Sequence, residues 1–176
     1  MNEKQAQQVG MHTDFFDRCE FAINNGFYLE AMFLEYAAIK GRLEAILGIL
    51  GAPCNKTLDA GQRGNIKISH RIECLKKIRN NNPVFAKTKL DHNFFYKNVK
   101  LSAWINKRNC YIHGLYKGER EYNGRMAGAK ELAETGYKLC RALYNETKRL
   151  NRLRKSKPEL FVSSRSCANA CFSSNH

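Results

Sequence analysis

Three polar residues in one short segment have the types and the spacing of a site that handles phosphate. Arg108, Asn109 and His113 lie within residues 104–116, a segment otherwise dominated by apolar and aromatic side chains. Arginine stays charged and offers a planar fork of donors to an anion, whereas histidine titrates near neutrality and can move a proton. Asn109 would orient the histidine or the anion. These residue types suit phosphate binding and proton transfer to or from its oxygens.

The element that carries this segment decides whether the three side chains can converge. If residues 101–115 form one helix, its apolar residues recur at spacings of three, four and seven, and Arg108 falls in the middle of their stripe. A buried guanidinium is costly unless it is paired, so Arg108 needs an acidic partner or a cavity for an anion. Asn109 and His113 would share the neighbouring face. The stripe consists of Leu101, Ile105, Ile112 and Leu115.

Two questions about this helix stay open at the level of sequence. Candidate acidic partners for the arginine lie on a long preceding helix: Glu30, Glu35 and Glu44. The second question is where the helix begins. A start at Asn106 would place Arg108 in the first turn, where free N–H groups and the helix dipole favour an anion. Either geometry suits a phosphate.

The segment RNCYIHG, residues 108–114, resembles the R-x4-H signature of the HEPN superfamily, in the form where a polar residue follows the arginine and a glycine follows the histidine. The likeness extends to a long helix before the motif, a tryptophan in the lead-in and a helix of the KELAETGYKLCRAL kind after it. It covers residues 14–153. The resemblance implies an all-α, HEPN-like helical bundle with a long second helix, and a homodimer in which two copies of the motif meet.

The resemblance also implies an activity. HEPN-type endoribonucleases need neither a metal nor another cofactor: the ribose 2′-hydroxyl attacks the adjacent phosphate, leaving a 2′,3′-cyclic phosphate and a 5′-hydroxyl. In that chemistry Arg108 and His113 would be the catalytic pair, with Asn109 in a supporting catalytic role. Further candidate contacts to RNA flank the motif: Lys107, Tyr116 and Lys117.

The biological setting rests on the same resemblance, which implies a toxin, antiviral defence or stress role and an antitoxin or sensor protein as a further partner. HEPN toxins paired with a nucleotidyltransferase antitoxin carry HxY, whereas this chain reads HGLY, so Tyr116 lies one position further along. That departure puts this antitoxin pairing in doubt, together with modification of the tyrosine. The alternative is a noncatalytic HEPN-like module that binds RNA, a nucleotide or a partner protein.

Charge is unevenly distributed along this basic chain of net charge +14. Residues 1–60 hold five Lys or Arg against eight Asp or Glu, a balance of −3, whereas residues 61–176 hold twenty-five against eight, a balance of +17. The basic part carries the motif. Such a field would attract RNA or another polyanion, although many of these side chains could simply solvate helix faces.

Length and composition narrow the classes of protein to which this chain can belong. A chain of 176 residues suits one domain with a real core, and it has neither a run of about 20 apolar residues nor the apolar core of a signal peptide. We therefore expect a cytoplasmic protein that does not enter membranes. Seven cysteines, an odd count without framework spacing, suggest reduced thiols. Cys167, Cys171 and His176 have knuckle-like spacing but lack a fourth ligand, so no metal site is expected.

Apolar periodicity predicts the remaining elements. A flexible leader at 1–12 should precede one HEPN-like domain at 13–155, and a disordered serine-rich tail should occupy 156–176. Helices are expected over 13–24 with Thr13 as the cap, 27–50, 69–80, 90 onward and 127–154, with a polar loop over 117–125.

Two of these helices carry specific expectations. The longest should pack through a seven-residue seam, Leu29, Tyr36, Leu43 and Leu50, interleaved with Met32, Ile39 and Ile46. Its alanines would permit close approach of another helix or of a second copy. In the helix over 69–80, one face should be buried and a basic face should point outward: Arg71, Lys76, Lys77 and Arg79.

Overall fold

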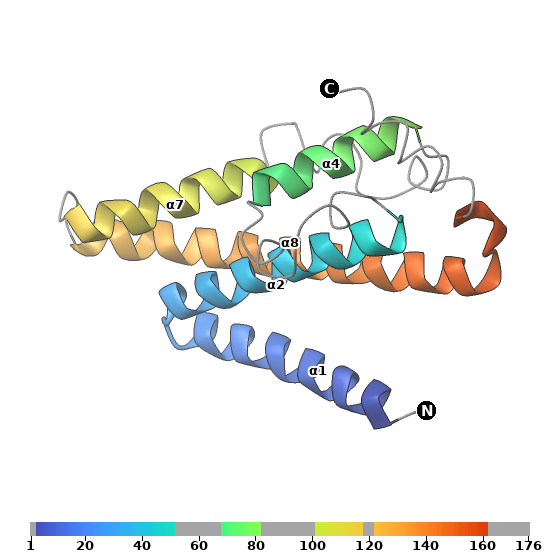
Figure 1. The fold of residues 1–176 in the computed structure, drawn as a ribbon. Helices are drawn as coiled ribbons and strands as arrows, with labels where there is room; N and C mark the ends of the chain where they lie inside the picture. The colour runs from blue at the N-terminus through green and yellow to red at the C-terminus, as the bar shows by residue number, and fades with distance from the viewer. Residues whose placement is uncertain (1–2, 52–67, 82–100, 118–121, 162–176) are drawn as a thin grey trace. The chain divides into compact units, whose positions relative to one another are not determined.

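The computed structural model describes residues 3–51, 68–81, 101–117 and 122–161, with side chains for 14–51, 68–78, 101–115 and 128–161. Every regular element in these ranges is a helix, which confirms the all-α class (Figure 1). The helices are α1 (Glu3–Asn24), α2 (Tyr28–Ile49), α4 (Ile68–Asn81), α7 (Leu101–Lys117) and α8 (Tyr122–Ser156).

Two helices begin earlier than predicted. α1 starts at Glu3, so most of the expected leader is helical and Thr13 lies inside the helix, where it cannot act as a cap. α8 starts at Tyr122 instead of near residue 127, and it takes in part of the expected polar loop. The α1 extension, EKQAQQVGMH, is rich in Glu, Lys, Gln and Ala, whose good helix propensity outweighs an isolated glycine. The α8 extension, YNGRM, has no such composition, and local propensity does not explain it.

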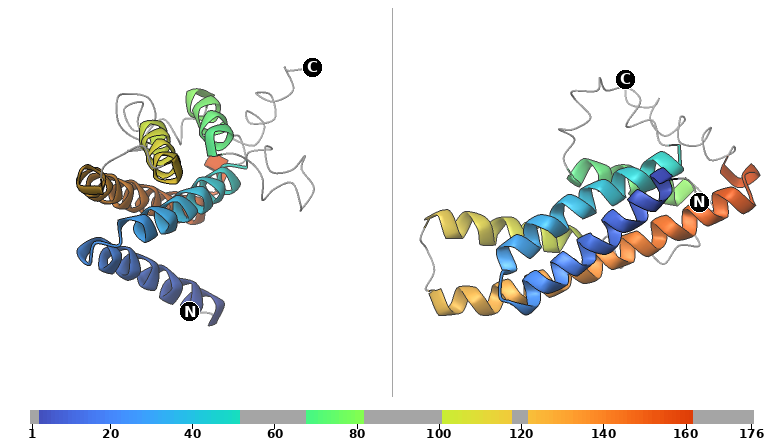
Figure 2. Two further views of the ribbon diagram at one scale, coloured as in Figure 1. Left: turned by 90° about the vertical axis from the view of Figure 1, so that its left-hand side faces the viewer. Right: turned by 90° about the horizontal axis from the view of Figure 1, so that it is seen from below.

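The turn between α1 and α2 was predicted correctly. Asn25 and Gly26 end α1, and Gly26 takes a left-handed backbone conformation with φ of 79°. Phe27 N–H then donates to the Ala22 carbonyl at 2.7 Å, which closes the turn. Figures 1 and 2 show the chain reversing there between the two helices. This turn brings the end of α1 close to the beginning of α2.

α2 matches its predicted range to within one residue at each end. Five of the seven seam residues are buried, whereas Tyr36 is only partly buried and Leu29, at the start of the helix, is 41% exposed. A straight helix drifts by about 20° per heptad against a strict seven-residue repeat, so a residue three heptads from the other end of the seam lies well off the buried stripe. The buried seam residues are Met32, Ile39, Leu43, Ile46 and Leu50.

The chain divides into two compact units, and α2 and α8 contribute to both. The first unit comprises residues 1–38 and 103–140. In it α7 runs alongside the first part of α8 (Figure 2), and Trp104 Nε1 donates to the Leu132 carbonyl at 2.8 Å. The core cluster of this unit draws on four helices: Ala22, Ala31, Met32, Tyr111, Ala129 and Ala133.

The second unit comprises residues 39–102 and 141–176. Here α4 buries Ile72, Leu75 and Ile78 as predicted. The outward orientation expected for Arg71 is wrong, because this residue is only 1% exposed. Its guanidinium donates to the Lys40 carbonyl at 3.0 Å and pairs with Glu44 at 3.2 Å, so the buried charge is compensated.

Several predictions fall outside the described residues. They include the helix from residue 90 onward, the serine-rich tail beyond residue 161 and the orientation of Arg79. Within the described ranges, none of the helices combines the length and the apolar character needed to cross a lipid bilayer. Cys19, Cys74, Cys110 and Cys140 are free thiols.

Candidate active site

α7 carries the whole R-x4-H segment as one uninterrupted helix from Leu101 to Lys117. This decides the second open question, on where the helix begins, against a start at Asn106. Arg108 and Asn109 lie in the helix interior, where their backbone N–H groups can bond within the helix. A phosphate site built on the N-terminus of this helix is therefore ruled out for these two residues, and any anion must be held by side chains.

The buried stripe of α7 is rotated from the predicted one, because Ile105, Ile112 and Leu115 are only partly buried. Arg108 is nevertheless buried, as predicted. It is 8% exposed and shares the stripe with Leu101, Trp104 and Tyr111. Its Nη1 donates to Asn109 Oδ1 at 3.0 Å.

Two aromatic rings of α2 face this guanidinium. Its Cζ lies 4.3 Å from the Tyr36 ring centroid and 5.1 Å from that of Phe33. Rings at this distance stabilise a cation through their quadrupole. Arg108 is therefore held by stacking and one side-chain amide.

The three candidate glutamates have different partners. Glu30 pairs with Arg18 at 3.6 Å, and Glu44 pairs with Arg71 at 3.2 Å. Only Glu35 interacts electrostatically with Arg108. It is fully buried, yet neither of its carboxyl oxygens has a hydrogen-bond partner among the described residues, and the same holds for the buried Nε of Arg108. The two groups are close without forming a hydrogen-bonded ion pair.

A glycine on α8 makes room for the Glu35 carboxyl. A Cβ added at Gly136 would collide with Glu35 Oε2 and would lie 2.6 Å from Trp104 Cζ2. α8 is anchored at the same level, because Cys140 Sγ donates to the backbone carbonyl of Glu35 at 3.4 Å. Gly136, Trp104 and Glu35 thus form a tightly packed layer beneath Arg108.

Burial dominates the electrostatics of this layer. Loss of hydration raises the pKa of Glu35 to about 9, even though the positive charge of Arg108 opposes the change. Burial also lowers the pKa of Arg108, while Tyr36 and Glu35 act to raise it. Glu35 is therefore protonated at neutral pH. A protonated carboxyl does not cancel the charge of the guanidinium.

His113 is exposed and lies on a different side of α7 from Arg108. Residues five apart on a helix are separated by about 140° around its axis. Asn109, which is half-buried, lies between them and shares a face with His113, as predicted. Within one chain the structure brings Arg108 and Asn109 into contact and directs the histidine to solvent.

The predicted substrate contacts have different environments. Lys107 is exposed and lines a shallow cavity of about 410 Å³ between α7 and α8, with Asn106, Cys110 and Glu131 among its neighbours. Tyr116 and Lys117 are the last two residues of α7, and their side chains lie outside the described part of the structure.

Sequence reasoning did not assign four of the site's neighbours to it: Phe33, Tyr36, Trp104 and Gly136. The sequence placed Tyr36 in the seam of α2. A signal existed for Phe33, because it lies three residues before Tyr36 and can therefore share a ligand with it. No sequence pattern relates Gly136 to Glu35, since their contact depends on how α2 and α8 pack.

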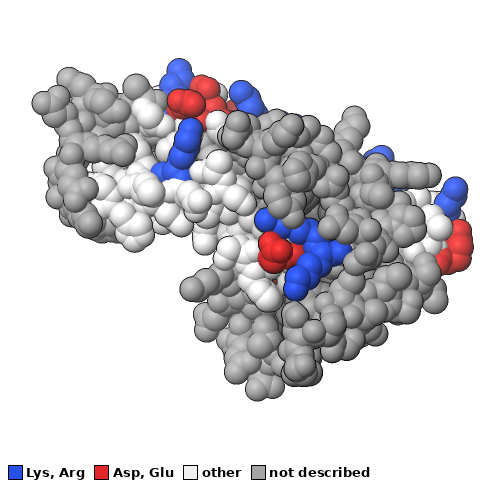
Figure 3. All heavy atoms as spheres, turned by 90° about the horizontal axis from the view of Figure 1, so that it is seen from above, with Lys and Arg blue, Asp and Glu red and all other residues white. Residues whose placement is uncertain are grey.

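Among the described residues, no group of three His, Cys, Asp or Glu side chains could hold a metal ion. The knuckle-like set near the C-terminus lies outside these residues. On the face shown in Figure 3, the described Asp and Glu side chains lie beside Lys and Arg side chains. The described basic groups on this face therefore do not form a purely cationic surface.

In comparisons with known proteins, no protein-family model, no curated protein and no solved structure matches the chain.

Proposed function

We propose that this chain is an endoribonuclease that cleaves RNA without a metal ion, by attack of a ribose 2′-hydroxyl on the adjacent phosphate. One observation carries the proposal: Arg108 is buried and charged, and no hydrogen-bonded carboxylate neutralises it among the described residues. Retaining an uncompensated cation in an apolar layer is costly. An anionic ligand that reaches the guanidinium would recover that cost.

The residues then divide the chemistry between them. His113 accepts the proton of the 2′-hydroxyl, or donates one to the departing 5′-oxygen, because the exposed imidazole can reach solvent and substrate and can act as a base or an acid. Arg108 binds the phosphate as negative charge grows on its oxygens. Asn109 holds Nη1 of the arginine and so fixes the direction of the fork. The P–O5′ bond breaks, leaving a cyclic phosphate and a free 5′-hydroxyl.

Two copies of the chain would complete the site. In one copy Arg108 and His113 point to different sides of α7, by about 140°, which is unfavourable for acting on a single phosphate. A second α7 placed against the first would supply a histidine opposite the arginine. The homodimer thus belongs to the same proposal, as do Lys107, Tyr116 and Lys117 as contacts to the flanking RNA.

The test is cleavage of a labelled single-stranded RNA by the purified protein in EDTA, with DNA of the same sequence beside it. We expect RNA alone to be cut, to end in a cyclic phosphate, and to be left intact by His113→Ala and Arg108→Ala. His70→Ala is the matched control, because His70 is also an exposed helical histidine but lies on α4. It should cleave at the wild-type rate.

The opposite result identifies the alternative function. If RNA and DNA are both bound but neither is cut, and if His113→Ala binds as well as wild type, the chain is a noncatalytic binding module. Its affinity should then fall steeply with salt, because phosphate contacts release counterions.

The biological setting is a further part of the proposal. An RNA-cleaving chain would act in the cytoplasm in a toxin, antiviral defence or stress role, under control of an antitoxin or sensor protein. Expression in a bacterial host tests this directly. Growth arrest that His113→Ala relieves supports the setting, whereas equal growth of hosts expressing wild type and the variant contradicts it.

A further inference from the structure

Large apolar side chains are exposed in one place only within the described part of the chain. They all lie within residues 21–33, at the end of α1 and the beginning of α2: Phe21, Phe27, Leu29 and Phe33. Phe21 is 63% exposed and Phe27 is 54% exposed, and their ring centroids are 6.5 Å apart. Such a patch, when permanently exposed, indicates a surface that another molecule covers.

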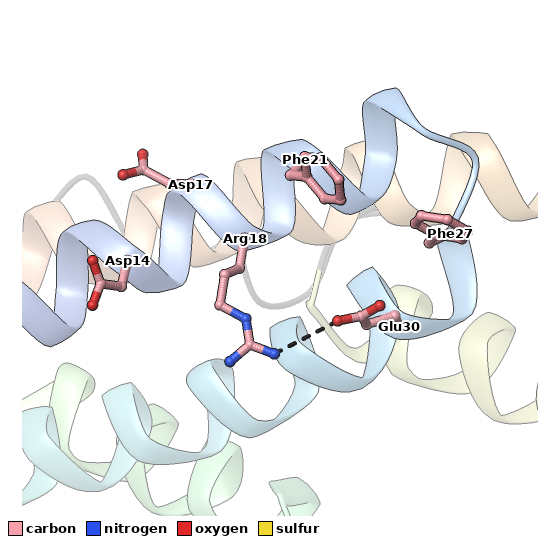
Figure 4. A pocket seen from close by; sticks show the side chains of 6 residues that line it. All are labelled: Asp14, Asp17, Arg18, Phe21, Phe27 and Glu30. Atoms are coloured by element: carbon pink, nitrogen blue, oxygen red, sulfur yellow. Dashed lines mark ion pairs between the residues drawn. The ribbon is translucent and has the colours of Figure 1, made fainter.

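Phe21 and Phe27 line an open groove of about 640 Å³ between α1 and α2. Figure 4 shows the two rings beside each other at the turn, with acidic side chains along the rest of the groove. The other residues that line it are Asp14, Asp17, Arg18 and Glu30. We refer to these six residues as the aromatic–acidic groove.

The charge of this groove is opposite to that of the whole protein. It carries three carboxylates and one guanidinium, whereas the net charge of the chain is +14. Arg18 pairs with Glu30 at 3.6 Å, and both side chains are more than half exposed. Exposed ion pairs of this kind contribute little, so the carboxylate remains available to another cation. The groove therefore suits a cationic partner whose side chains can also cover aromatic rings.

The same chain carries such a segment at the end of α8. Residues 147–157 contain six Lys or Arg and no Asp or Glu, and several of these cations are exposed, including Arg152 and Arg154. Cation–aromatic stacking already recurs in this protein: Arg42 and Lys148 both lie over the Tyr144 ring, at 5.0 and 4.6 Å. Arginine combines this stacking with bidentate pairing to carboxylates.

We propose that the aromatic–acidic groove binds the basic end of α8 from a second copy of this chain. Arg152 and Arg154 would stack on Phe21 and Phe27, and their guanidinium groups would pair with the carboxylates of the groove. A second copy is favoured over a foreign protein because it brings the complementary charge wherever the chain is made. Reciprocal exchange between two copies gives a closed pair. The inference stands whether or not the motif cleaves RNA.

Charge exchange between two variants tests the contact. One variant, Asp14→Lys/Asp17→Lys, makes the groove basic; the other, Arg152→Glu/Arg154→Glu, makes the end of α8 acidic. Each alone places like charges together and should weaken self-association by about tenfold or more. Mixing the two restores opposite charges at both contacts. Molar mass from light scattering, measured from low to high salt, is the readout, with circular dichroism to verify folding.

We expect the molar mass of wild type to fall from low to high salt, each variant to have a lower mass than wild type at low salt, and their mixture to recover the wild-type mass. Lys77→Glu/Lys138→Glu is the control for Arg152→Glu/Arg154→Glu, because it makes the same change in net charge at exposed positions of α4 and α8. It should associate like wild type. Phe21→Ser/Phe27→Ser should weaken association without any change in charge.

Three results would overturn the inference. The first is a wild-type mass of one chain at every salt concentration. The second is a molar mass at low salt that is the same in both charge variants as in wild type, which would show that the groove and the end of α8 do not contribute to association. The third is a mixture of the variants that stays as separate chains. RNA cleavage is measured separately, so loss of association and loss of catalysis remain distinguishable.

Discussion

Two buried arginines of this protein each face a glutamate of α2, and they differ in how their charge is compensated. Arg71, in the second unit, is hydrogen-bonded to the Lys40 carbonyl and paired with Glu44 at 3.2 Å. Arg108, in the first unit, bonds to Asn109 and stacks on Tyr36, and its neighbour Glu35 makes no hydrogen bond among the described residues. The ion pair with Glu44 therefore compensates the charge of Arg71, whereas no ion pair compensates the charge of Arg108.

The difference lies in the surroundings of the two glutamates. The side chain of Glu44 is 46% exposed, so water still reaches the carboxyl group that pairs with Arg71. Glu35 is fully buried, and desolvation raises its pKa to about 9. The pair with Glu44 makes Arg71 a cross-link between α2 and α4. A protonated partner makes Arg108 a cation that can still accept an anion.

Among substitutions compared at one pH, the largest expected effect on stability distinguishes the two arginines. Arg71→Met should lower the free energy of unfolding by about 2 to 3 kcal/mol, because Glu44 loses its partner and a carbonyl loses its donor. Arg108→Met removes a charge that no carboxylate pairs, so it should change stability by about 1 kcal/mol or less, in either direction. Urea unfolding of both variants measures this, and equal losses would contradict the distinction.

A smaller effect is expected at the glycine beneath Arg108. Gly136→Ala inserts a methyl group against Glu35 and Trp104 and should cost about 2 kcal/mol through overpacking. Gly128→Ala, on the same helix with nothing within 4 Å of the new Cβ, should instead stabilise by up to about 1 kcal/mol. Thermal melting of the two variants compares them. A neutral Gly136→Ala would mean that the Glu35 carboxyl is not held in this layer.

The pH dependence of stability tests the state of Glu35. Its pKa rises from 4.5 to about 9 on folding, so between these values the folded chain holds a proton that the unfolded chain has released. This contribution to stability is complete below pH 4.5 and is lost as the pH rises towards 9, with a slope of at most about 1.4 kcal/mol per pH unit.

Glu35→Gln imitates the protonated carboxyl and should remove that slope. The variant should match wild type near pH 5 and exceed its stability at pH 8. Glu44→Gln is the matched control, and it should instead lose stability at neutral pH because its pair with Arg71 is weakened. Parallel pH profiles for wild type and Glu35→Gln would show that Glu35 is already ionised.

The smallest effect concerns the only side-chain hydrogen bond of Arg108 in the described structure. Asn109→Ala removes the bond from Nη1 at 3.0 Å and should cost about 1 kcal/mol. Because the fork loses its orientation, RNA cleavage should fall more than stability does. Cleavage rates and urea unfolding of this variant, measured side by side, decide the point. A loss of stability with full activity would make the asparagine purely structural.

Local sequence patterns were sufficient for much of the fold. The periodicity of α2 predicted its limits, and the stripe on α7 predicted that Arg108 would be buried. The same periodicity could have predicted that Arg71 is buried. Arg71 precedes Leu75 by four residues and Ile78 by seven, so it lies on the buried stripe of α4. It was instead assigned to the basic face because charged residues are usually exposed. Its burial depends on Glu44, which is distant in sequence.

What the sequence determined by itself is therefore the helices, their apolar stripes and the presence of a cation within one stripe. Those features follow from periodicity and local propensity, which act over a few residues. The tertiary structure alone decided that Glu35, among three glutamates, faces Arg108. It also decided that Gly136 makes room for the Glu35 carboxyl and that this carboxyl is protonated. Partner choice and pKa depend on packing and desolvation between segments far apart in the chain.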